Sequence, residues 1–140
     1  MYRLFPSSKD FSPGWSGFGG LSSSDLVFSW NERKQLSGDD TQIGAQLWKA
    51  YASGDTESLR QLSTCNSEAF QLLPEVVAAH LERLHCADKL PRPQETLLEI
   101  VKKGRKTFPD IFQEFSRREG VYGFGDAQVR AMLDEMNIDY

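Results

Sequence analysis

The sequence has little of what several functional classes require. No run of about 18 or more apolar residues occurs in it, so no segment is suited to span a membrane. The first residues lack the apolar stretch of a secretion signal. The chain has just two cysteines, Cys65 and Cys86, which we interpret as buried or half-buried thiols. We therefore expect a cytoplasmic protein without a membrane segment.

Residues for catalysis are scarce as well. The two histidines, His80 and His85, fall on different sides of a helix, and we interpret them as a core-edge residue and a helix-dipole partner. No Gly-x-Ser-x-Gly, His-Glu-x-x-His or Walker motif occurs. Residues 123–126 match the start of a dinucleotide fingerprint, but no strand precedes them, so we interpret them as a turn with Asp126 as a helix N-cap. We expect neither an enzyme nor a cofactor or metal site.

The chain also lacks the excess of positive charge that nucleic-acid binding would require. The net charge of the chain is −4. Residues 1–88 contain 7 basic and 11 acidic residues, whereas residues 89–140 contain 9 of each. A dedicated nucleic-acid module usually has a clear basic excess. The balance of charge therefore does not favour one.

Apolar residues are plentiful, and their spacing is helical. Hydrophobic residues make up 39% of the chain and aromatic residues 11%, which is enough for a packed core. Strand signals are nearly absent. Residues 121–124 could form a short extended segment, but their glycine weakens that prediction. The sequence predicts an all-α protein.

Residues 1–20 predict an N-terminal arm. Glycine, serine and proline break any helical period there. Aromatic residues nevertheless recur in this segment at Phe5, Phe11, Trp15 and Phe18. Such a segment either lays its rings over the helical body or docks onto a partner or a missing domain. We expect an extended arm pinned by its rings, in its own or a neighbouring protomer, and Trp15 and Phe18 are candidate partner contacts.

Residues 21–140 predict a single helical domain, and residues 21–88 form its front helices. A first short helix begins near Ser24. Ser37 and Asp40 have the spacing of a capping box and indicate the start of a stronger helix. Each helix has apolar residues on one side: Leu26, Val27 and Trp30 in the first, and Ile43, Leu47, Ala50 and Tyr51 in the second.

Three further front helices follow, and the middle one is a short helix from Asn66 or Ser67 to Leu72. Gly54 ends the second helix, and Asp55 can cap a third one that turns Leu59 inward. Pro74 lacks an amide hydrogen and clashes with a preceding helical turn. It therefore belongs in the first turn of a new helix, which runs to about His85.

Residues 89–140 predict a tri-helical unit with three capped segments. The first covers residues 93–103 and is stopped by Gly104, the second begins at Thr107, and the third begins at Asp126. Apolar residues at i, i+3, i+4 and i+7 mark the last two: Phe108, Ile111, Phe112 and Phe115, then Val129, Met132, Leu133 and Met136. Three such helices are the skeleton of a helix-turn-helix or winged-helix module, here without a wing.

Such a unit makes nucleic-acid binding the first function to test. Two basic clusters are candidate phosphate contacts: Lys102, Lys103, Arg105 and Lys106, and then Arg117 and Arg118. Each cluster also lies at a helix C-terminus, where cations offset the helix dipole. The third helix offers just Gln128 and Arg130 for reading base edges. We therefore expect no specific duplex binding.

Single residues in a fixed order recur along residues 17–136. They are Gly20, Leu21, Ser22, Leu26 and Arg33, then Leu47 to Tyr51, Asp55 and Leu59, then Leu73, Pro74, Ala78, His80 and Leu81, and finally Glu95, Leu98, Ile100, Gly104, Phe112, Gly125 and Asp126. This order resembles the C-terminal region of the bacterial domain-of-unknown-function 1835 family. The family's N-terminal α/β module and a wing hairpin after Tyr140 have no counterpart here. The resemblance implies little about activity, because the family's role is not established.

A protein-interaction or regulatory module is the most direct functional prediction. The tri-helical unit carries more aromatic surface than three short helices easily bury, and we expect Phe112 and Leu133 to be core residues. Tyr122 and Phe124, flanked by glycines, are candidate contacts to a protein partner or a second copy, with core packing as an equal alternative. Two other functions stay open. They are a DNA- or RNA-binding winged-helix-like regulator, and an accessory part of an enzyme whose catalytic module is absent from this chain.

Overall fold

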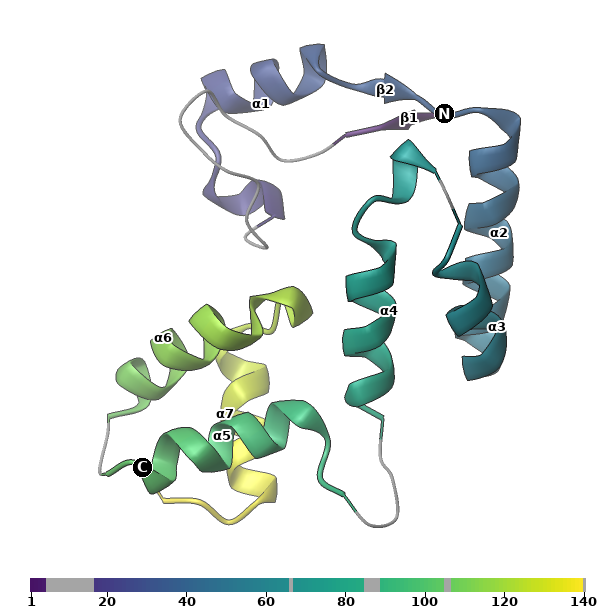
Figure 1. Cartoon of the computed structure of the whole chain (residues 1–140). Helices are drawn as coiled ribbons and strands as arrows, with labels where there is room; N and C mark the ends of the chain where they lie inside the picture. The colour runs from purple at the N-terminus through teal and green to yellow at the C-terminus, as the bar shows by residue number, and fades with distance from the viewer. Residues whose placement is uncertain (5–16, 66, 85–88, 105–106, 140) are drawn as a thin grey trace. The chain divides into compact units, whose positions relative to one another are not determined.

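The computed structural model describes residues 1–4, 17–65, 67–84, 89–104 and 107–139. These residues contain seven α-helices, three short 3-10 helices and one two-stranded sheet (Figure 1). The prediction of an all-α protein is therefore confirmed. Several residues singled out by the sequence lie outside the described ranges: Phe5, Phe11, Trp15, His85, Cys86, Arg105 and Lys106.

The chain divides into two compact units, unit 1 (Met1–Leu81) and unit 2 (Glu82–Tyr140). The division falls close to the boundary expected between the front helices and the tri-helical unit. Among the described residues, none of the helices has both the length and the apolar character needed to cross a bilayer.

Unit 1 begins with a small antiparallel sheet. Strand β1 (Tyr2–Arg3) pairs with β2 (Lys34–Gln35), so that Tyr2 lies opposite Gln35. The Arg3 guanidinium donates a hydrogen bond to the Glu68 carbonyl, and Lys34 Nζ lies 3.7 Å from the Glu68 carboxylate. These contacts tie the sheet to a later segment of unit 1.

The next elements of unit 1 are η1 (Gly17–Gly20), α1 (Ser23–Asn31) and α2 (Gly38–Ser53). A capping box that we did not predict starts α1, because Asp25 accepts hydrogen bonds from the Ser22 amide and hydroxyl. The predicted capping box of α2 is confirmed, with the Asp40 carboxylate 2.9 Å from the Ser37 amide. Gly54 then ends α2 in the left-handed conformation, with a φ of 70° that favours glycine.

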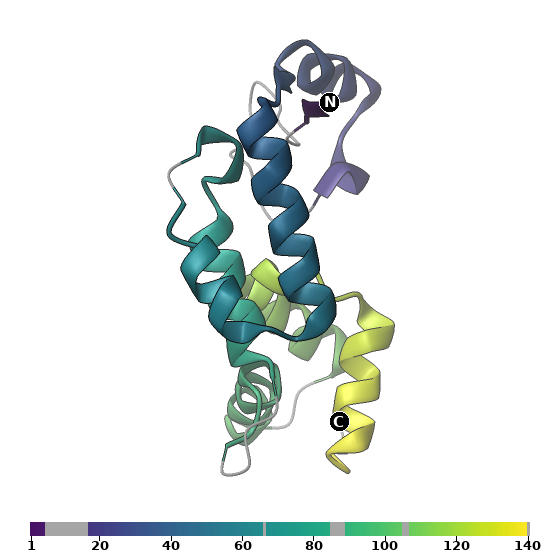
Figure 2. The ribbon, with the colours of Figure 1, turned by 90° about the vertical axis from the view of Figure 1, so that its right-hand side faces the viewer.

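Three more elements complete unit 1: α3 (Thr56–Leu62), η2 (Glu68–Phe70) and α4 (Leu73–Glu82). Asp55 caps α3 and Pro74 lies in the first turn of α4, as predicted. Figures 1 and 2 show α4 running beside α2 in the same direction. Among the described residues, the core of unit 1 lies between α2, α3 and α4 and is small. Its buried residues are Ala50, Leu59 and Val77, and the partly buried residues around them are Leu47, Leu62, Leu73 and Leu81.

Unit 2 contains the three predicted helices, α5 (Arg92–Lys102), α6 (Phe108–Glu119) and α7 (Asp126–Glu135). Their apolar faces meet in one core formed by Leu97, Ile100, Phe108, Ile111, Phe115, Val129 and Leu133. The prediction that Leu133 is a core residue is confirmed. Phe112 is partly buried and packs against the edge of this core.

The weak strand signal in unit 2 is not realised, and one local prediction is wrong. Residues 121–124 are not extended: Gly120–Tyr122 form the 3-10 helix η3, and Gly123 follows in the left-handed conformation. The N-cap of α7 is Gly125 rather than Asp126. The reason is Gln128, whose side-chain oxygen accepts a hydrogen bond from the Gly125 amide at 2.9 Å and so moves the cap one residue earlier.

Candidate functional site

Exposed apolar side chains concentrate in unit 1. Among the described residues, the large exposed hydrophobics of unit 1 are Met1, Tyr2, Phe18, Leu26, Val27, Trp30, Trp48, Tyr51, Leu72 and Val76. Those of unit 2 are Leu84 and Leu90, which both precede α5. The sequence predicted partner contacts in both units (Trp15, Phe18, Tyr122 and Phe124), whereas the structure places most of the exposed apolar side chains in unit 1.

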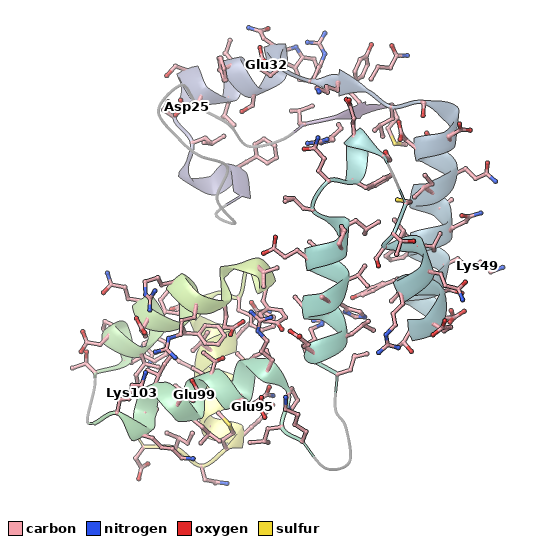
Figure 3. The ribbon with its side chains drawn as sticks, viewed as in Figure 1. Asp25, Glu32, Lys49, Glu95, Glu99 and Lys103 are labelled. Carbon is pink, nitrogen blue, oxygen red and sulfur yellow. The ribbon has the colours of Figure 1, made fainter. Side chains whose placement is uncertain are left out.

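Helix α1 turns its apolar side outward. Val27 is 61% exposed and Trp30 is 54% exposed, while Ser29 on another side is 1% exposed. The predicted apolar side of this helix is present, and its three residues Leu26, Val27 and Trp30 form what we call the α1 stripe. Figure 3 shows the helix between its labelled residues Asp25 and Glu32, with side chains projecting away from it. A helix that buries serine and exposes tryptophan reverses the usual order of burial.

Trp30 is held in place by an arginine. The Arg33 guanidinium lies 4.5 Å from the centre of the Trp30 ring and 5.3 Å from that of Tyr2. It also donates a hydrogen bond of 2.8 Å to the Trp30 carbonyl. Cation–π contacts of this kind stabilise an exposed ring by roughly 0.5–1 kcal/mol. These contacts hold the Trp30 ring in one orientation.

A second apolar surface lies where α2 and α4 run side by side. The Trp48 and Tyr51 rings are 5.9 Å apart, and the Tyr51 ring is 5.1 Å from that of His80 on α4. Val76 lies one helical turn before His80 and is also exposed. We call Trp48, Tyr51, Val76 and His80 the α2–α4 face. Its most exposed member is Trp48, at 68%.

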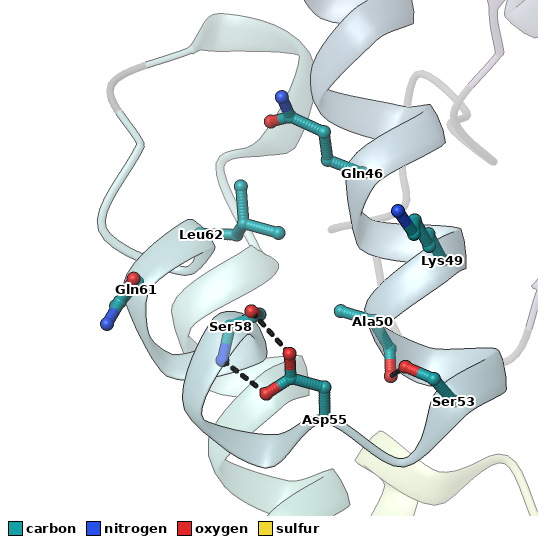
Figure 4. Close-up of a pocket in the computed structure, with 8 residues that line it drawn as sticks. All are labelled: Gln46, Lys49, Ala50, Ser53, Asp55, Ser58, Gln61 and Leu62. Atoms are coloured by element: carbon teal, nitrogen blue, oxygen red, sulfur yellow. Dashed lines mark hydrogen bonds between the residues drawn. The ribbon is translucent and has the colours of Figure 1, made fainter.

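A polar groove of about 440 Å³ lies between α2 and α3 (Figure 4). Its lining residues are Gln46, Lys49, Ala50, Ser53, Asp55, Ser58, Gln61 and Leu62. Asp55 accepts hydrogen bonds from the Ser58 amide and hydroxyl, which keep the pKa of its carboxyl below the ordinary value. The Ser53 hydroxyl donates to the Ala50 carbonyl. The helices themselves thus use most of the polar groups that would bind a ligand or carry out chemistry.

The second predicted basic cluster is neutralised within unit 2. Arg117 lies 2.9 Å from Glu114, and Arg118 pairs with Glu114 at 2.7 Å and with Glu99 at 3.3 Å. Hydrogen bonds from Arg117 and Arg118 lower the pKa of Glu114 to about 2. The carboxylate is therefore charged at neutral pH and competes with any phosphate for these arginines.

The first basic cluster is more open. Lys102 and Lys103 are exposed at the end of α5, and Figure 3 labels Lys103 and Glu99 on this helix. Arg105 and Lys106, the other predicted members, lie outside the described residues. The described part of this cluster is one pair of lysines at a helix C-terminus.

Both candidate base-reading side chains of α7 are exposed, but each contacts its own unit. Gln128 caps its own helix through Gly125, and the Arg130 guanidinium lies 3.6 Å from the centre of the Phe108 ring. A recognition helix needs such side chains directed at base edges. The geometry of α7 therefore does not support that role.

The predicted partner contacts in unit 2 lie at the edge of its core. Tyr122 and Phe124 are half-buried and stacked with ring centres 5.2 Å apart, and Phe124 stacks on buried Phe115 at 6.4 Å. Burial raises the pKa of Tyr122. Phe18, another predicted contact, is exposed in unit 1, and Trp15 lies outside the described residues.

A partly buried ion pair in unit 2 was not predicted. Glu119 is 5% exposed, and its Oε2 lies 3.0 Å from Arg92 Nε, while its Oε1 accepts a 2.7 Å hydrogen bond from the Thr96 hydroxyl. Arg92 also donates to Glu82 at 2.6 Å, and this hydrogen bond is the main reason that its pKa is raised. Oε2 has no hydrogen bond of its own, because the Arg92 N–H is directed at Oε1. The arrangement joins α5 to α6.

No metal-binding cluster of three or more His, Cys, Asp or Glu side chains occurs in the described ranges. Cys65 is half-buried, as predicted, and carries no disulfide. Comparison with known proteins found no matching family model, no matching curated protein and no matching solved structure. The case for a function therefore rests on the surfaces described above.

Proposed function

We propose that this chain is a cytoplasmic, non-enzymatic protein-interaction or regulatory module that binds its partner through unit 1. The observation that carries the proposal is the exposure of Val27, Trp30 and Trp48 on two helices of one small unit. Soluble monomers rarely leave large contiguous apolar surface uncovered unless it serves binding.

The composition of these surfaces supports the proposal. Tryptophan, tyrosine and arginine are the residues that most often contribute large binding energies at interfaces. The α1 stripe combines Trp30 with Arg33 and Tyr2, and the α2–α4 face combines Trp48 with Tyr51. Ring contacts fix these side chains in advance, so less conformational entropy is lost when a partner binds.

Nucleic-acid binding is the second candidate and has less support. One specific observation favours it, namely the exposed pair Lys102 and Lys103. The ion pairs of Arg117 and Arg118 with glutamates oppose it, as does the use of Arg130 inside unit 2. Binding through two lysines would be weak and would fade with added salt.

The resemblance to the domain-of-unknown-function 1835 family is part of the same proposal. Several of its matching residues have structural roles here: Asp55 caps α3, while Leu59 and Ile100 are buried in the two cores. A region built from such residues would serve as a helical scaffold for an interaction surface.

Site-specific photo-crosslinking in the native cells tests the proposal. The photoreactive residue replaces Ala52, which is exposed one turn after Trp48 on α2. We expect a discrete protein adduct from this position. The matched control replaces Ala131, an exposed alanine on α7. Adducts from position 131 with none from position 52 would contradict binding through unit 1.

A further inference from the structure

We infer that the partner of unit 1 is a second copy of this chain, in which the α1 stripe of each copy packs on the α2–α4 face of the other. The inference rests on the proposed function and names its partner. Two different apolar surfaces on one unit can satisfy each other when two copies are related by a two-fold axis, because each pairing then occurs twice.

The amount of apolar surface favours this arrangement. A fully covered aromatic side chain buries roughly 150–250 Å², and a stable interface needs about 800 Å² on each partner. The α1 stripe has one such ring, Trp30, and the α2–α4 face has Trp48 and Tyr51. Each surface alone thus falls well short of what a stable interface needs, and the two together come closer to it. A reciprocal dimer covers both surfaces of each copy at once.

The shapes of the two surfaces are also suited to each other. Leu26 and Trp30 are spaced at i and i+4 and so project from one side of a nine-residue helix, α1. Anchors at this spacing are typical of a helix that lies in an apolar groove between other helices. The α2–α4 face joins two helices that run side by side, with Trp48 on one and Val76 on the other.

None of the members of the two surfaces carries a permanent charge, but the Arg33 guanidinium lies over the Trp30 ring beside the α1 stripe. The α1 stripe consists of Leu26, Val27 and Trp30, and His80 is the one titratable member of the α2–α4 face other than Tyr51. Burying an unpaired charge is costly, so the pairing must leave the Arg33 guanidinium at the solvent-exposed edge of the contact.

Sedimentation or light scattering of the full chain over a range of concentrations tests the inference. We expect the wild type to dimerise reversibly. Trp30→Asp and Trp48→Asp should each raise the dimer dissociation constant by roughly 30-fold or more, the loss expected for a central aromatic anchor. Leu90→Asp is the matched control, because Leu90 is exposed in unit 2, and this variant should dimerise like the wild type.

Mixing the two tryptophan variants distinguishes the reciprocal pairing from other dimers. Trp30→Asp retains an intact α2–α4 face and Trp48→Asp retains an intact α1 stripe, so the mixture can form one of the two contacts. We expect the mixture to associate more strongly than either variant alone. Equal association of mixture and single variants would overturn the pairing. Circular dichroism checks that each variant keeps its helices.

A wild type that stays monomeric at every concentration would overturn the inference outright. If position 52 then still gave an adduct with a different protein, the proposed interaction function would hold and the second copy would be ruled out as the partner. An adduct with the mass of two chains would support both. Absence of any adduct from position 52 would contradict the proposed function itself.

Discussion

Among individual residues, Arg92 and Glu119 have the least usual placement. Arg92 stands at the first position of α5 and Glu119 at the last of α6, and both positions oppose the helix dipole. Their positions are therefore not explained by the stability of either helix alone. Each is explained by the other, through the ion pair that joins the two helices.

Removing the two partners should have unequal effects. Arg92→Ala leaves the carboxylate of Glu119 buried and uncompensated, and should lower the free energy of unfolding by about 3–5 kcal/mol. Glu119→Ala leaves Arg92, whose side chain is 40% exposed, still paired with Glu82, and should cost about 1–3 kcal/mol. Urea denaturation measures both values.

A surface variant provides the control for this comparison. Arg117 also pairs with a glutamate but is 69% exposed, so Arg117→Ala should cost no more than about 1 kcal/mol. If Glu119→Ala proved as costly as Arg92→Ala, the burial of the carboxylate would not be the dominant effect.

Local residue patterns could be predicted from the sequence, and distant ones could not. The Ser37–Asp40 cap and the Asp55 cap involve residues three apart, so their spacing is visible in the chain. The contact of Glu119 with Thr96 joins residues 23 positions apart, and no local pattern marks it. Even a short-range contact can be missed: Gln128 accepts a hydrogen bond from the Gly125 amide, so the N-cap is Gly125 and not the predicted Asp126.

At the level of the helices, the N-terminus of α2 is held by several hydrogen bonds to one carboxylate, that of Asp40. The Asp40 carboxylate accepts hydrogen bonds from the Ser67 hydroxyl at 2.6 Å and from the Ser37 amide and hydroxyl. These bonds, with that of Ser67 the largest cause, hold the pKa of Asp40 below its ordinary value of 3.8. The cap of α2 thus also fixes the segment that leads into η2.

This arrangement predicts how stability depends on pH. Because the pKa of Asp40 is lower in the folded state, its stabilisation is fully present above 3.8 and is lost as the pH falls through the folded value. Between about pH 5 and about pH 3, the melting temperature of the wild type should therefore fall more than that of Asp40→Asn. Other carboxylates titrate equally in both proteins. Parallel pH profiles would show that the Ser67 and Ser37 contacts do not favour the charged form.

Helical periodicity predicted which residues share a side but not what covers that side. In unit 2 the stripe of Val129 and Leu133 is buried, as the spacing indicated. In α1 the equally apolar stripe of Val27 and Trp30 faces solvent. Both helices thus have their apolar residues on one side. Whether that side is buried depends on packing partners elsewhere in the chain, which the spacing does not reveal. This is why the sequence predicted the candidate contacts Phe18, Tyr122 and Phe124 but not the exposure of the α1 stripe and the α2–α4 face.

In the whole molecule, the two units differ in how much core they have. Among the residues that the structure describes, the core of unit 2 is built from seven buried residues, whereas that of unit 1 has three. Each fully buried large side chain contributes roughly 1.5–3 kcal/mol. Unit 2 therefore has the larger share of the hydrophobic stabilisation.

The difference predicts that unit 2 folds without unit 1. A fragment covering Glu82–Tyr140 keeps its whole core and the Glu82 partner of Arg92, so it should be helical and unfold cooperatively. The fragment Met1–Leu81 should have a lower melting temperature. Circular dichroism melts of the two fragments measure this. A gradual, non-cooperative loss of helix in the Glu82–Tyr140 fragment would show instead that the expected single domain over residues 21–140 is needed for folding.

The positions of the tryptophans have a spectroscopic consequence. Trp15, Trp30 and Trp48 all belong to unit 1, and unit 2 contains no tryptophan. Tryptophan fluorescence, excited selectively, therefore reports on unit 1 alone, while far-ultraviolet ellipticity reports on both units. Since Trp30 and Trp48 already lie mostly in water, their contribution to the emission should shift little towards the red on unfolding. A blue shift that grows with protein concentration would instead record their rings leaving water for an apolar contact, without any label attached to the chain.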